Sequence, residues 1–450
     1  MTYVIYYRKH NTDLCIKNQK KHFMKVSKSV FLFLLILSFT KGFSQFTIDA
    51  ELRPRFEYRH GYKTLFPDNA DPATFVSQRT RLNFGYKTEK LHFYLSPQDV
   101  RVWGDVPQLN VADENGFSLH QAWADVLLTS DLSLKIGRQE IIYDDQRFFG
   151  NVGWAQQGRS HDAAILKYEP SFLKFHFGAA YNQDGEALTG NILTTNTYKS
   201  LQYLWLHKDW EQLSASFLFV NNGLQYIDEI DESKNDTRYS QTAGLHLKAN
   251  LSKFNFASNL YYQFGKDVAN NDLNAYLLSL EANYSALESL KIGLGGELQS
   301  GNDYGAPSDG ENKAFNPLYG TNHKFNGFMD YFYVGNHINN VGLLDLYGNV
   351  KYAFNKQSNV QLAFHQFFAA AEIDDNTSKD LGFELDLVTS HKLSQFVGIQ
   401  AGYSHFFAAE GIEIVKNNFD KNTNNWGWLM VTIDPVLFTW QKPETDNNNQ

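Results

Sequence analysis

Arginine side chains recur at every second position in two neighbouring parts of the chain. Arg53, Arg55 and Arg59 alternate with apolar residues, and Arg79 and Arg81 alternate in the same way further along. A guanidinium group is always ionised, and it can donate two parallel hydrogen bonds to one carboxylate. Several such groups on one wall would bind a carboxylate at each step weakly enough to release it, which a conducting pore requires.

Other charged residues, one beside these arginines and the rest in later strands and in the long segment after Arg138, are candidates for the same inner surface. These candidate pore-lining residues are Arg138, Arg147 and Arg159 among the cations and Glu57, Glu384 and Asp386 among the anions. Charges of opposite sign across a lumen often pair with each other. Two interpretations therefore stay open, in which the arginines either bind a passing anion or neutralise the carboxylates beside them.

Strands are the elements that would position these side chains, because alternation puts every second residue on one face. Alternating runs recur from Gln45 onward, for example at 80–88, 290–299 and 381–387. A soluble sandwich and a membrane barrel both fit this period. Pro54 has no N–H to donate to a neighbouring strand, so we expect a bulge there.

The connections between the runs favour a membrane barrel. Tight turns alternate with long stretches rich in Asn, Asp, Gly and Ser, and about eight turns and nine loops close a barrel at 18 strands. The predicted fold is all-β: a transmembrane antiparallel up-and-down β-barrel of about 18 strands, with short periplasmic turns and long extracellular loops.

Aromatic residues, 15% of the chain, gather near the ends of the expected strands. Such residues form girdles at the two lipid interfaces of membrane barrels, although ordinary core packing is the alternative. The girdle candidates are Phe93, Tyr94, Tyr168, Tyr284, Tyr352, Tyr403, Phe406 and Phe407.

The N-terminal region contains the one long apolar run, which is too short to cross a bilayer as a helix. Lysines precede it and small residues follow it, so residues 1–44 are predicted to be a secretory signal peptide, with Met24 as an alternative start. The barrel then covers 45–440. Residues 441–450 form a polar tail that we expect to be disordered.

Composition and spacing exclude several functions. The net charge of -9 gives no electrostatic footprint for nucleic acid, and the single cysteine lies in the predicted signal peptide. We expect no cofactor, no metal site and no enzyme. Ser160, His161 and Asp162 are contiguous, and neighbours on a strand point to opposite faces, so they cannot form a hydrolase triad directly.

One segment, 143–154, allows three interpretations: a loop folded into the pore, a cation site at Asp144 and Asp145, or a solvated loop. The lack of calcium-loop spacing favours a solvated loop over a cation site.

The chain resembles the alginate export family of outer-membrane barrels. The resemblance is carried, in the family's order, by 52–59, 77–86, 134–154, 315–332, 381–387 and 402–408. It implies an 18-stranded monomeric barrel in the outer membrane that passes an anionic polysaccharide through an arginine-lined pore.

From these observations we expect a channel for alginate-like polysaccharides or oligosaccharides, working by charge-selected passive diffusion. The expected partners are the anionic saccharide, outer-membrane lipid and the barrel assembly machinery, which would read Phe438 or Trp440 at the end of the last strand. The alternatives are a general porin or uptake channel for other small organic acids or oligosaccharides, and a plugged barrel that serves as a surface adhesin or scaffold.

Overall fold

The structure is a computed structural model that describes residues 44–109, 116–307, 309–333, 335–419 and 422–442. The larger of its two compact units comprises Gln45–Trp440, and the fold described below is that of this unit. The predicted signal peptide and the predicted tail lie outside the described residues, apart from Ser44, Gln441 and Lys442, so both stay predictions. No helix in the described part of the chain is long and apolar enough to cross a membrane.

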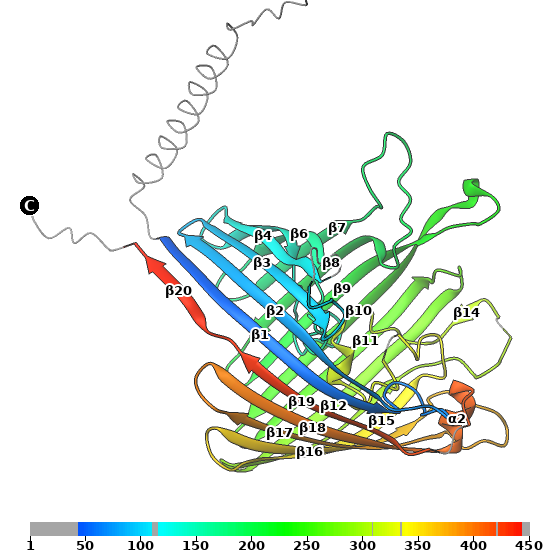
Figure 1. The fold of residues 1–450 in the computed structure, drawn as a ribbon. Coiled ribbons are helices and arrows are strands. Elements are labelled where there is room, and N and C mark those ends of the chain that lie inside the picture. The colour runs from blue at the N-terminus through cyan, green and yellow to red at the C-terminus, as the bar shows by residue number, and fades with distance from the viewer. Residues whose placement is uncertain (1–43, 110–115, 308, 334, 420–421, 443–450) are drawn as a thin grey trace, which may run out of the picture. The chain divides into compact units, whose positions relative to one another are not determined.

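Antiparallel strands joined in chain order form a closed barrel (Figure 1). Within the described residues its eighteen strands are β1 (Ser44–His60), β2 (Ala73–Thr88), β3 (Leu91–Val102), β4 (Phe117–Leu127), β5 (Leu132–Gln139), β6 (His161–Tyr168), β7 (Lys174–Tyr181), β8 (Tyr198–Asp209), β9 (Leu213–Tyr226), β10 (Asp236–Leu251), β11 (Phe254–Lys266), β12 (Asp272–Leu287), β13 (Leu290–Gln299), β15 (Leu343–Ala353), β16 (Ser358–Phe368), β17 (Asp380–Lys392), β18 (Val397–Ala408) and β19 (Asn424–Ile433). The first and last strands close the barrel, with Leu52 opposite Ile433. The predicted barrel of 18 strands is confirmed.

Five smaller elements of the described chain do not belong to this ring of strands. They are β14 (Glu311–Asn312), η1 (Glu232–Lys234), η2 (Asn322–Lys324), α2 (Glu410–Lys416) and β20 (Val436–Gln441). β20 follows β19 after Asp434 and Pro435 and also pairs with β1. β20 thus continues β19 after one interruption, and both of them pair with β1.

The two ends of the barrel differ in their connections, as the sequence predicts. The short-turn end carries tight turns such as 89–90 between β2 and β3, whereas the long-loop end carries long segments such as 182–197 between β7 and β8. Figure 1 shows the short turns on the left and the long loops on the right. Two of the longest connections, 140–160 and 300–342, are called the first and second inner loops below.

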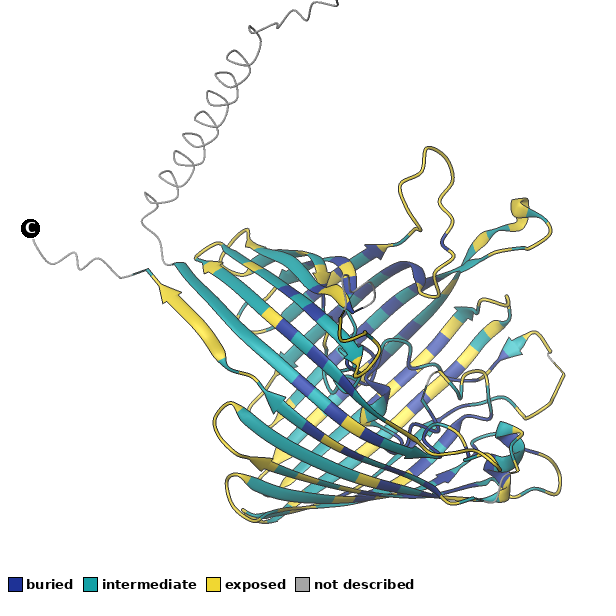
Figure 2. Cartoon of the chain, in the orientation of Figure 1, coloured by how far each residue is buried: buried dark blue, intermediate teal, exposed yellow. Residues whose placement is uncertain are grey.

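The strands have one apolar and one polar face. Phe56 on β1 is 45% exposed on the outside, while its neighbours Arg55 and Glu57 are buried on the inside. Figure 2 shows this alternation of exposed and buried residues along the strands. An outward apolar surface of this kind suits contact with lipid tails.

Two of the predicted girdle residues face inward, and the bulge expected at Pro54 is missing from the β1–β19 ladder. Tyr94 lies on the face of β3 that carries buried Ser96 and Gln98. Phe406 is 1% exposed and packs inside the barrel on Tyr331, so it is not a girdle residue. The β1–β19 register is the same on both sides of Pro54, so this ladder has no bulge there. A bulge occurs instead at Pro97, where the β3–β4 register shifts.

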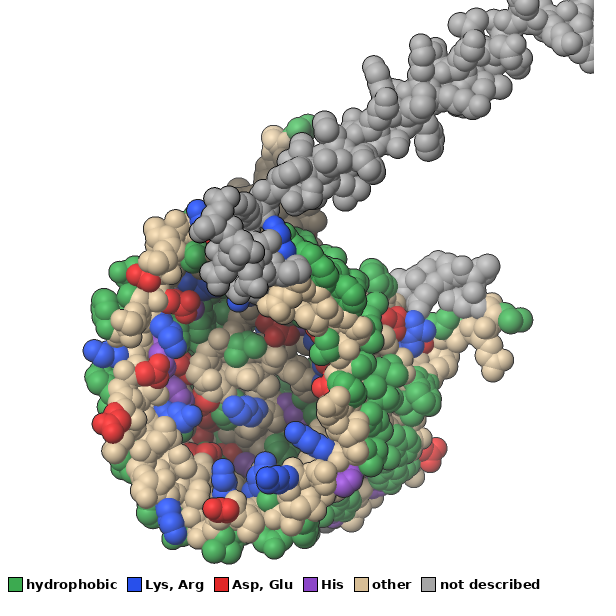
Figure 3. Space-filling view, turned by 90° about the vertical axis from the view of Figure 1, so that its left-hand side faces the viewer, with side chains coloured by type: hydrophobic (Ala, Val, Ile, Leu, Met, Phe, Trp, Pro, Cys, Tyr) green, Lys and Arg blue, Asp and Glu red, His purple; other side chains and the backbone are tan. Residues whose placement is uncertain are grey.

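The interior is filled at mid-height and hollow at the short-turn end. Two buried apolar clusters form where the inner loops pack on inward strand faces, one around Met329 and Trp426 and the other around Phe149 and Tyr203. Figure 3 looks into the short-turn end, where Lys and Arg side chains line a hollow. The inner loops therefore decide what can pass along the lumen.

Candidate functional site

The first inner loop is fixed to one wall of the barrel through two aspartates. Asp144 accepts hydrogen bonds from Trp205 Nε1 (3.1 Å) and from the Ser216 hydroxyl. Asp145 accepts one from Asn259 Nδ2 (2.7 Å). Burial raises the pKa of Asp144 above its ordinary value, an effect that these donors only partly offset. Both side chains thus anchor a loop inside the pore, as one of the three sequence-based interpretations of this segment proposes.

The opposite side of the same loop meets the arginines of β1. Arg53 donates from Nη1 to the Gly153 carbonyl oxygen (2.8 Å) and from Nε to Gln156 Oε1 (3.1 Å). Arg55 donates from Nη1 to the Trp154 carbonyl oxygen (2.7 Å), and its guanidinium carbon lies 3.9 Å from the centre of a Trp154 ring. These contacts hold the loop against the wall.

The arginines of β2 complete this contact. Arg79 Nη1 donates to the Gln156 carbonyl oxygen (3.4 Å), and Arg81 Nη2 donates to that of Gln157 (3.2 Å). Arg79 also pairs with Glu51, where Nε lies 2.7 Å from Oε1. The arginine wall, defined as Arg53, Arg55, Arg79 and Arg81, is buried and points at loop backbone rather than at open lumen.

Arg147 ties the two inner loops to a third wall. Its guanidinium forms a bidentate pair with Glu297 on β13 and also donates to Asn322 Oδ1 (3.4 Å) and Asn326 Oδ1 (3.1 Å). The side chain is 2% exposed, so the charge of Arg147 is used inside the protein. An uncompensated charge at this depth would be costly, which explains the paired geometry.

Three predicted anionic pore residues also use their carboxylates inside the protein. Glu384 accepts the backbone N–H of Met329 (2.8 Å) and lies under the second inner loop. Asp386 accepts the hydroxyl of Ser404. Glu57 pairs with the guanidinium groups of Arg55 and Arg59, at 2.9 and 2.8 Å. All three carboxylates face inward and all are buried.

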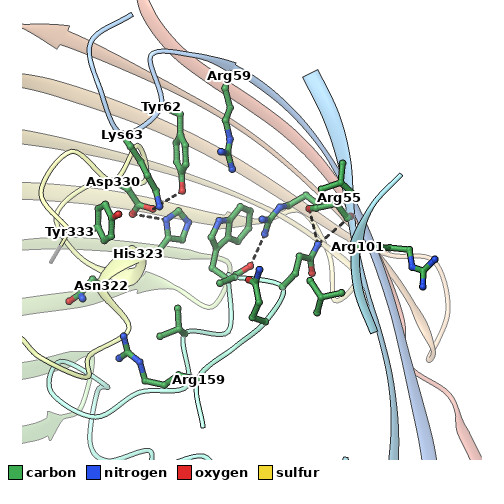
Figure 4. A pocket seen from close by; sticks show the side chains of 18 of the residues that line it. Arg55, Arg59, Tyr62, Lys63, Arg101, Arg159, Asn322, His323, Asp330 and Tyr333 are labelled. Atoms are coloured by element: carbon green, nitrogen blue, oxygen red, sulfur yellow. Dashed lines mark hydrogen bonds and ion pairs between the residues drawn. The ribbon is translucent and has the colours of Figure 1, made fainter. Parts of the chain in front are cut away.

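A cavity of about 490 Å³ lies between the arginine wall and the inner loops, on the side of the long loops. Its cationic lining residues are Arg55, Arg59, Lys63, Arg101 and Arg159, and its carboxylates are Asp105 and Asp330. In Figure 4, Arg55 and Arg59 come from β1, Lys63 from the loop after it, and Arg159 and Asp330 from the inner loops, while Arg101 of β3 stands at the edge. We call this space the cationic cavity.

The cations of this cavity differ in how they are held. Arg159 donates from Nη1 to the Gly320 carbonyl oxygen (3.0 Å), and among the described residues its guanidinium forms no ion pair. Burial lowers the pKa of Arg159. Arg59 shares Glu57 but keeps 34% of its side chain exposed. These two arginines are therefore the predicted site residues with donors left for an anion.

Asp330 organises the far wall of the cationic cavity. It accepts from Tyr62 Oη (2.6 Å), lies 2.9 Å from His323 Nδ1, and has the Lys63 ammonium at 3.9 Å. Burial alone would raise the pKa of Asp330, but His323, the tyrosine hydroxyl and Lys63 outweigh it and hold this pKa below its ordinary value. A charged Asp330 thus links the second inner loop to the loop that follows β1.

Arg138 does not line the cationic cavity, because it lies on the outward face of its strand. It shares the outward face of β5 with exposed Ile136, and its Nη1 lies 2.8 Å from Asp162 Oδ2. The sequence reasoning also missed Lys63, Tyr62 and Asp330. Lys63 and Tyr62 directly follow the first arginine run, and Asp330 falls in 315–332, one of the segments that carry the family resemblance. Their positions could have drawn attention, but the sequence does not show that these distant residues meet in the folded chain.

Ser160 takes part in a hydrogen-bonded chain that differs from the contiguous triad considered above. Its hydroxyl lies 3.3 Å from His120 Nδ1, and His120 Nε2 lies 2.7 Å from Glu140 Oε1. His161 instead lies 3.0 Å from the Tyr198 hydroxyl. Across the ranges that the structure describes, no group of three or more His, Cys, Asp or Glu side chains is arranged to hold a metal ion.

Comparisons with known proteins agree with this architecture. The sequence model of the alginate export family matches residues 44–425. No curated protein matches the chain. Similar solved structures include OccK11 of Pseudomonas aeruginosa, with a TM-score of 0.54, 14% identity and 88% of this chain and 98% of that chain covered. OccAB4 of Acinetobacter baumannii has a TM-score of 0.58, 14% identity and coverages of 88% and 98%.

A further similar structure is that of the P. aeruginosa outer membrane protein OpdK, solved with vanillate. It has a TM-score of 0.56, 11% identity, and coverages of 88% of this chain and 99% of that chain. At such low identities these likenesses show the shared barrel fold.

Proposed function

The chain belongs to the alginate export family and is an outer-membrane β-barrel channel, and from this premise we propose that it passes anionic saccharides by charge-selected passive diffusion. The short-turn end then faces the periplasm and the long-loop end faces the cell exterior. The substrate would be an alginate-like polysaccharide or oligosaccharide that carries a carboxylate on its sugar units.

The cationic cavity is the observation that supports this proposal. Five cations line the cavity, against two lining carboxylates and the carboxylates of Glu57 and Asp99 beside it, so a carboxylate inside the cavity would meet a small excess of positive charge. Arg59, with 34% of its side chain exposed, and Arg159, which forms no ion pair among the described residues, supply the donors. Attraction from several weak sites lets an anion enter and also leave, which diffusion through a channel needs.

The arginine wall offers a way for a bound anion to move the first inner loop. Its guanidinium groups donate to neutral carbonyl oxygens of the first inner loop, and a charged carboxylate is the stronger acceptor. A saccharide carboxylate that reaches the wall would compete for these donors and loosen the loop. The substrate would thereby widen its own path while neutral solutes would not.

Planar bilayers test the proposal with the purified channel. In a salt gradient the parent should be anion-selective, and oligogalacturonate should block the small-anion current. Replacing Arg59 and Arg159 with Gln should lower the anion preference several-fold, because these variants remove two charges and few anchoring contacts. Lys379→Gln, which removes an exposed lysine paired with Glu372, is the control that should change neither property. A closed or cation-selective parent would contradict the proposal.

Two alternatives each have a specific observation in their favour. OpdK is solved with vanillate, an organic acid, so a channel for small acids would show block by such acids and none by oligogalacturonate. The interlocked inner loops favour a plugged barrel that acts as an adhesin or scaffold. A plugged barrel would conduct no ions in the parent or in loop variants.

We further propose that the channel acts without catalysis, as a monomer in lipid delivered by the barrel assembly machinery. The chain of Ser160, His120 and Glu140 is the feature closest to a hydrolytic arrangement, and it joins a strand to the first inner loop. Ester hydrolysis by the purified protein that disappears in Ser160→Ala would contradict a purely structural role.

A further inference from the structure

A second cavity of about 370 Å³ lies beside the cationic cavity and has a different lining. Hydroxyl and amide groups dominate it, from Ser160, Asn182, Thr195, Thr197, Tyr198 and Tyr319. We call it the hydroxyl cavity. It is formed where the first inner loop enters β6, where the second inner loop presents Tyr319, and where the connection between β7 and β8 covers both.

The lining chemistry suits an uncharged, hydroxyl-rich group. Arg138 and Asp162 also line the cavity, and their charges are paired with each other at 2.8 Å. The rings of Tyr198 and Tyr319 stand nearly perpendicular, with centroids 5.4 Å apart, and offer apolar surface beside the polar groups. Hydroxyls and amides that can both donate and accept, next to aromatic rings, are what a pyranose ring with its hydroxyl groups requires.

A buried histidine in this cavity has an unused polar atom. His161 is 4% exposed, and its Nδ1 lies 3.0 Å from the Tyr198 hydroxyl. Within the described residues its Nε2 is buried without a hydrogen-bond partner. Buried polar atoms are rarely left unpaired, because losing water without a replacement costs free energy. A ligand hydroxyl that enters the cavity is a chemically suitable partner.

Arg159 lines both cavities and therefore joins them. One guanidinium is within reach of a carboxylate on one side and of sugar hydroxyls on the other. We propose that the hydroxyl cavity is a saccharide subsite, which holds the hydroxyl groups of one sugar unit while the carboxylate of the chain is held in the cationic cavity. This inference rests on the proposed function and adds the specificity that positive charge alone lacks.

The consequence is discrimination between anions. The cationic cavity attracts any carboxylate, whereas a site that hydrogen-bonds ligand hydroxyls rejects an analogue without them. Removing cavity hydroxyls should therefore weaken binding of a uronate oligomer and leave binding of a plain dicarboxylate unchanged.

The experiment uses the full-length channel in planar bilayers with ligands added on the long-loop side. Block of the chloride current is titrated with a galacturonate trimer and, separately, with glutarate, which has no hydroxyl groups. Tyr198→Phe combined with Thr197→Val removes two lining hydroxyls and keeps the shape of the cavity. We expect about tenfold weaker block by the trimer, as for the loss of one or two hydrogen bonds, and unchanged block by glutarate.

Tyr403→Phe is the matched control, since Tyr403 is exposed on the outer face of β18. It should change block by neither ligand. Equal weakening for both ligands, or unchanged block by the trimer, would overturn the subsite. An anion-selective parent that the trimer fails to block would overturn it as well, whereas a parent without anion selectivity would refute the proposed function itself.

Discussion

Arg53 offers the sharpest test of how the first inner loop is held. Five hydrogen bonds run from its guanidinium to Gly153, Trp154, Ala155 and Gln156. Replacing Arg53 with alanine removes all five and leaves the acceptors on the loop without a donor from this side chain. We expect the loop to leave the wall more often and the channel to conduct more.

The size of the effect follows from the contacts. Two of the five are 3.3 Å long, and Gln156 Oε1 accepts two of them, so the group is equivalent to about one strong charge-assisted hydrogen bond, roughly 2 kcal/mol. At 1.4 kcal/mol for each factor of ten, the ratio of open to closed loop would rise about 30-fold. An open form at about 1% would then reach roughly a quarter of the population.

Single-channel recording measures this ratio directly as the fraction of time spent in the high-conductance state. Arg53→Lys separates the hydrogen bonds from the charge, since an ammonium keeps the charge but cannot span three backbone acceptors in a planar fork. Arg53→Lys should therefore resemble Arg53→Ala more than the parent. Parent-like open times in Arg53→Lys would show that charge alone holds the loop, and parent-like open times in Arg53→Ala would refute the anchoring role.

Other predictions follow from the same contacts. Arg147→Ala should destabilise the barrel by about 3–5 kcal/mol in urea unfolding, because Glu297 would stay buried without its partner, and Glu297→Gln in the same chain should recover part of the loss. The pKa of Asp330 is lower in the folded protein than in an unfolded chain. Asp330 therefore contributes stability at a pH above the ordinary aspartate pKa, and this contribution is lost as the pH falls through the pKa of the folded protein. Conductance should therefore rise below about pH 4, and Asp330→Asn should remove this step. Gly327→Ala should also raise conductance at neutral pH, because φ is +82° there and a Cβ atom would lie 2.7 Å from the carboxylate of Glu384.

The sequence was sufficient for the barrel because each strand carries its own alternation. Phe56 and Arg55 show their faces without any knowledge of distant residues, and the short and long connections can be counted directly. The same rule already assigned Arg138 to the outer face, since it has the parity of Leu134 and Ile136. Choosing it for the pore gave residue type more weight than position.

The interior was harder to predict because it depends on contacts between distant segments. The partners of Arg53 and Arg55 are mostly backbone carbonyls about a hundred residues away, and every residue has a carbonyl, so no residue type reveals them. Asp330 meets Tyr62 across an even larger separation. Which loops fold inward, and against which wall, is fixed by many such pairs together.

The carbonyl anchoring of the first inner loop also has a consequence for evolution. Backbone acceptors are retained when side chains change, so apart from Trp154 and Gln156, whose side chains make contacts of their own, the segment 153–157 is free to accumulate substitutions while the arginine wall keeps its hold. Substitutions in this segment could then change the surface that a solute meets while the arginines still hold the first inner loop in place. Related channels should accordingly vary more at 153, 155 and 157 than at Arg53 and Arg55, and grafting foreign residues at those three positions should be tolerated.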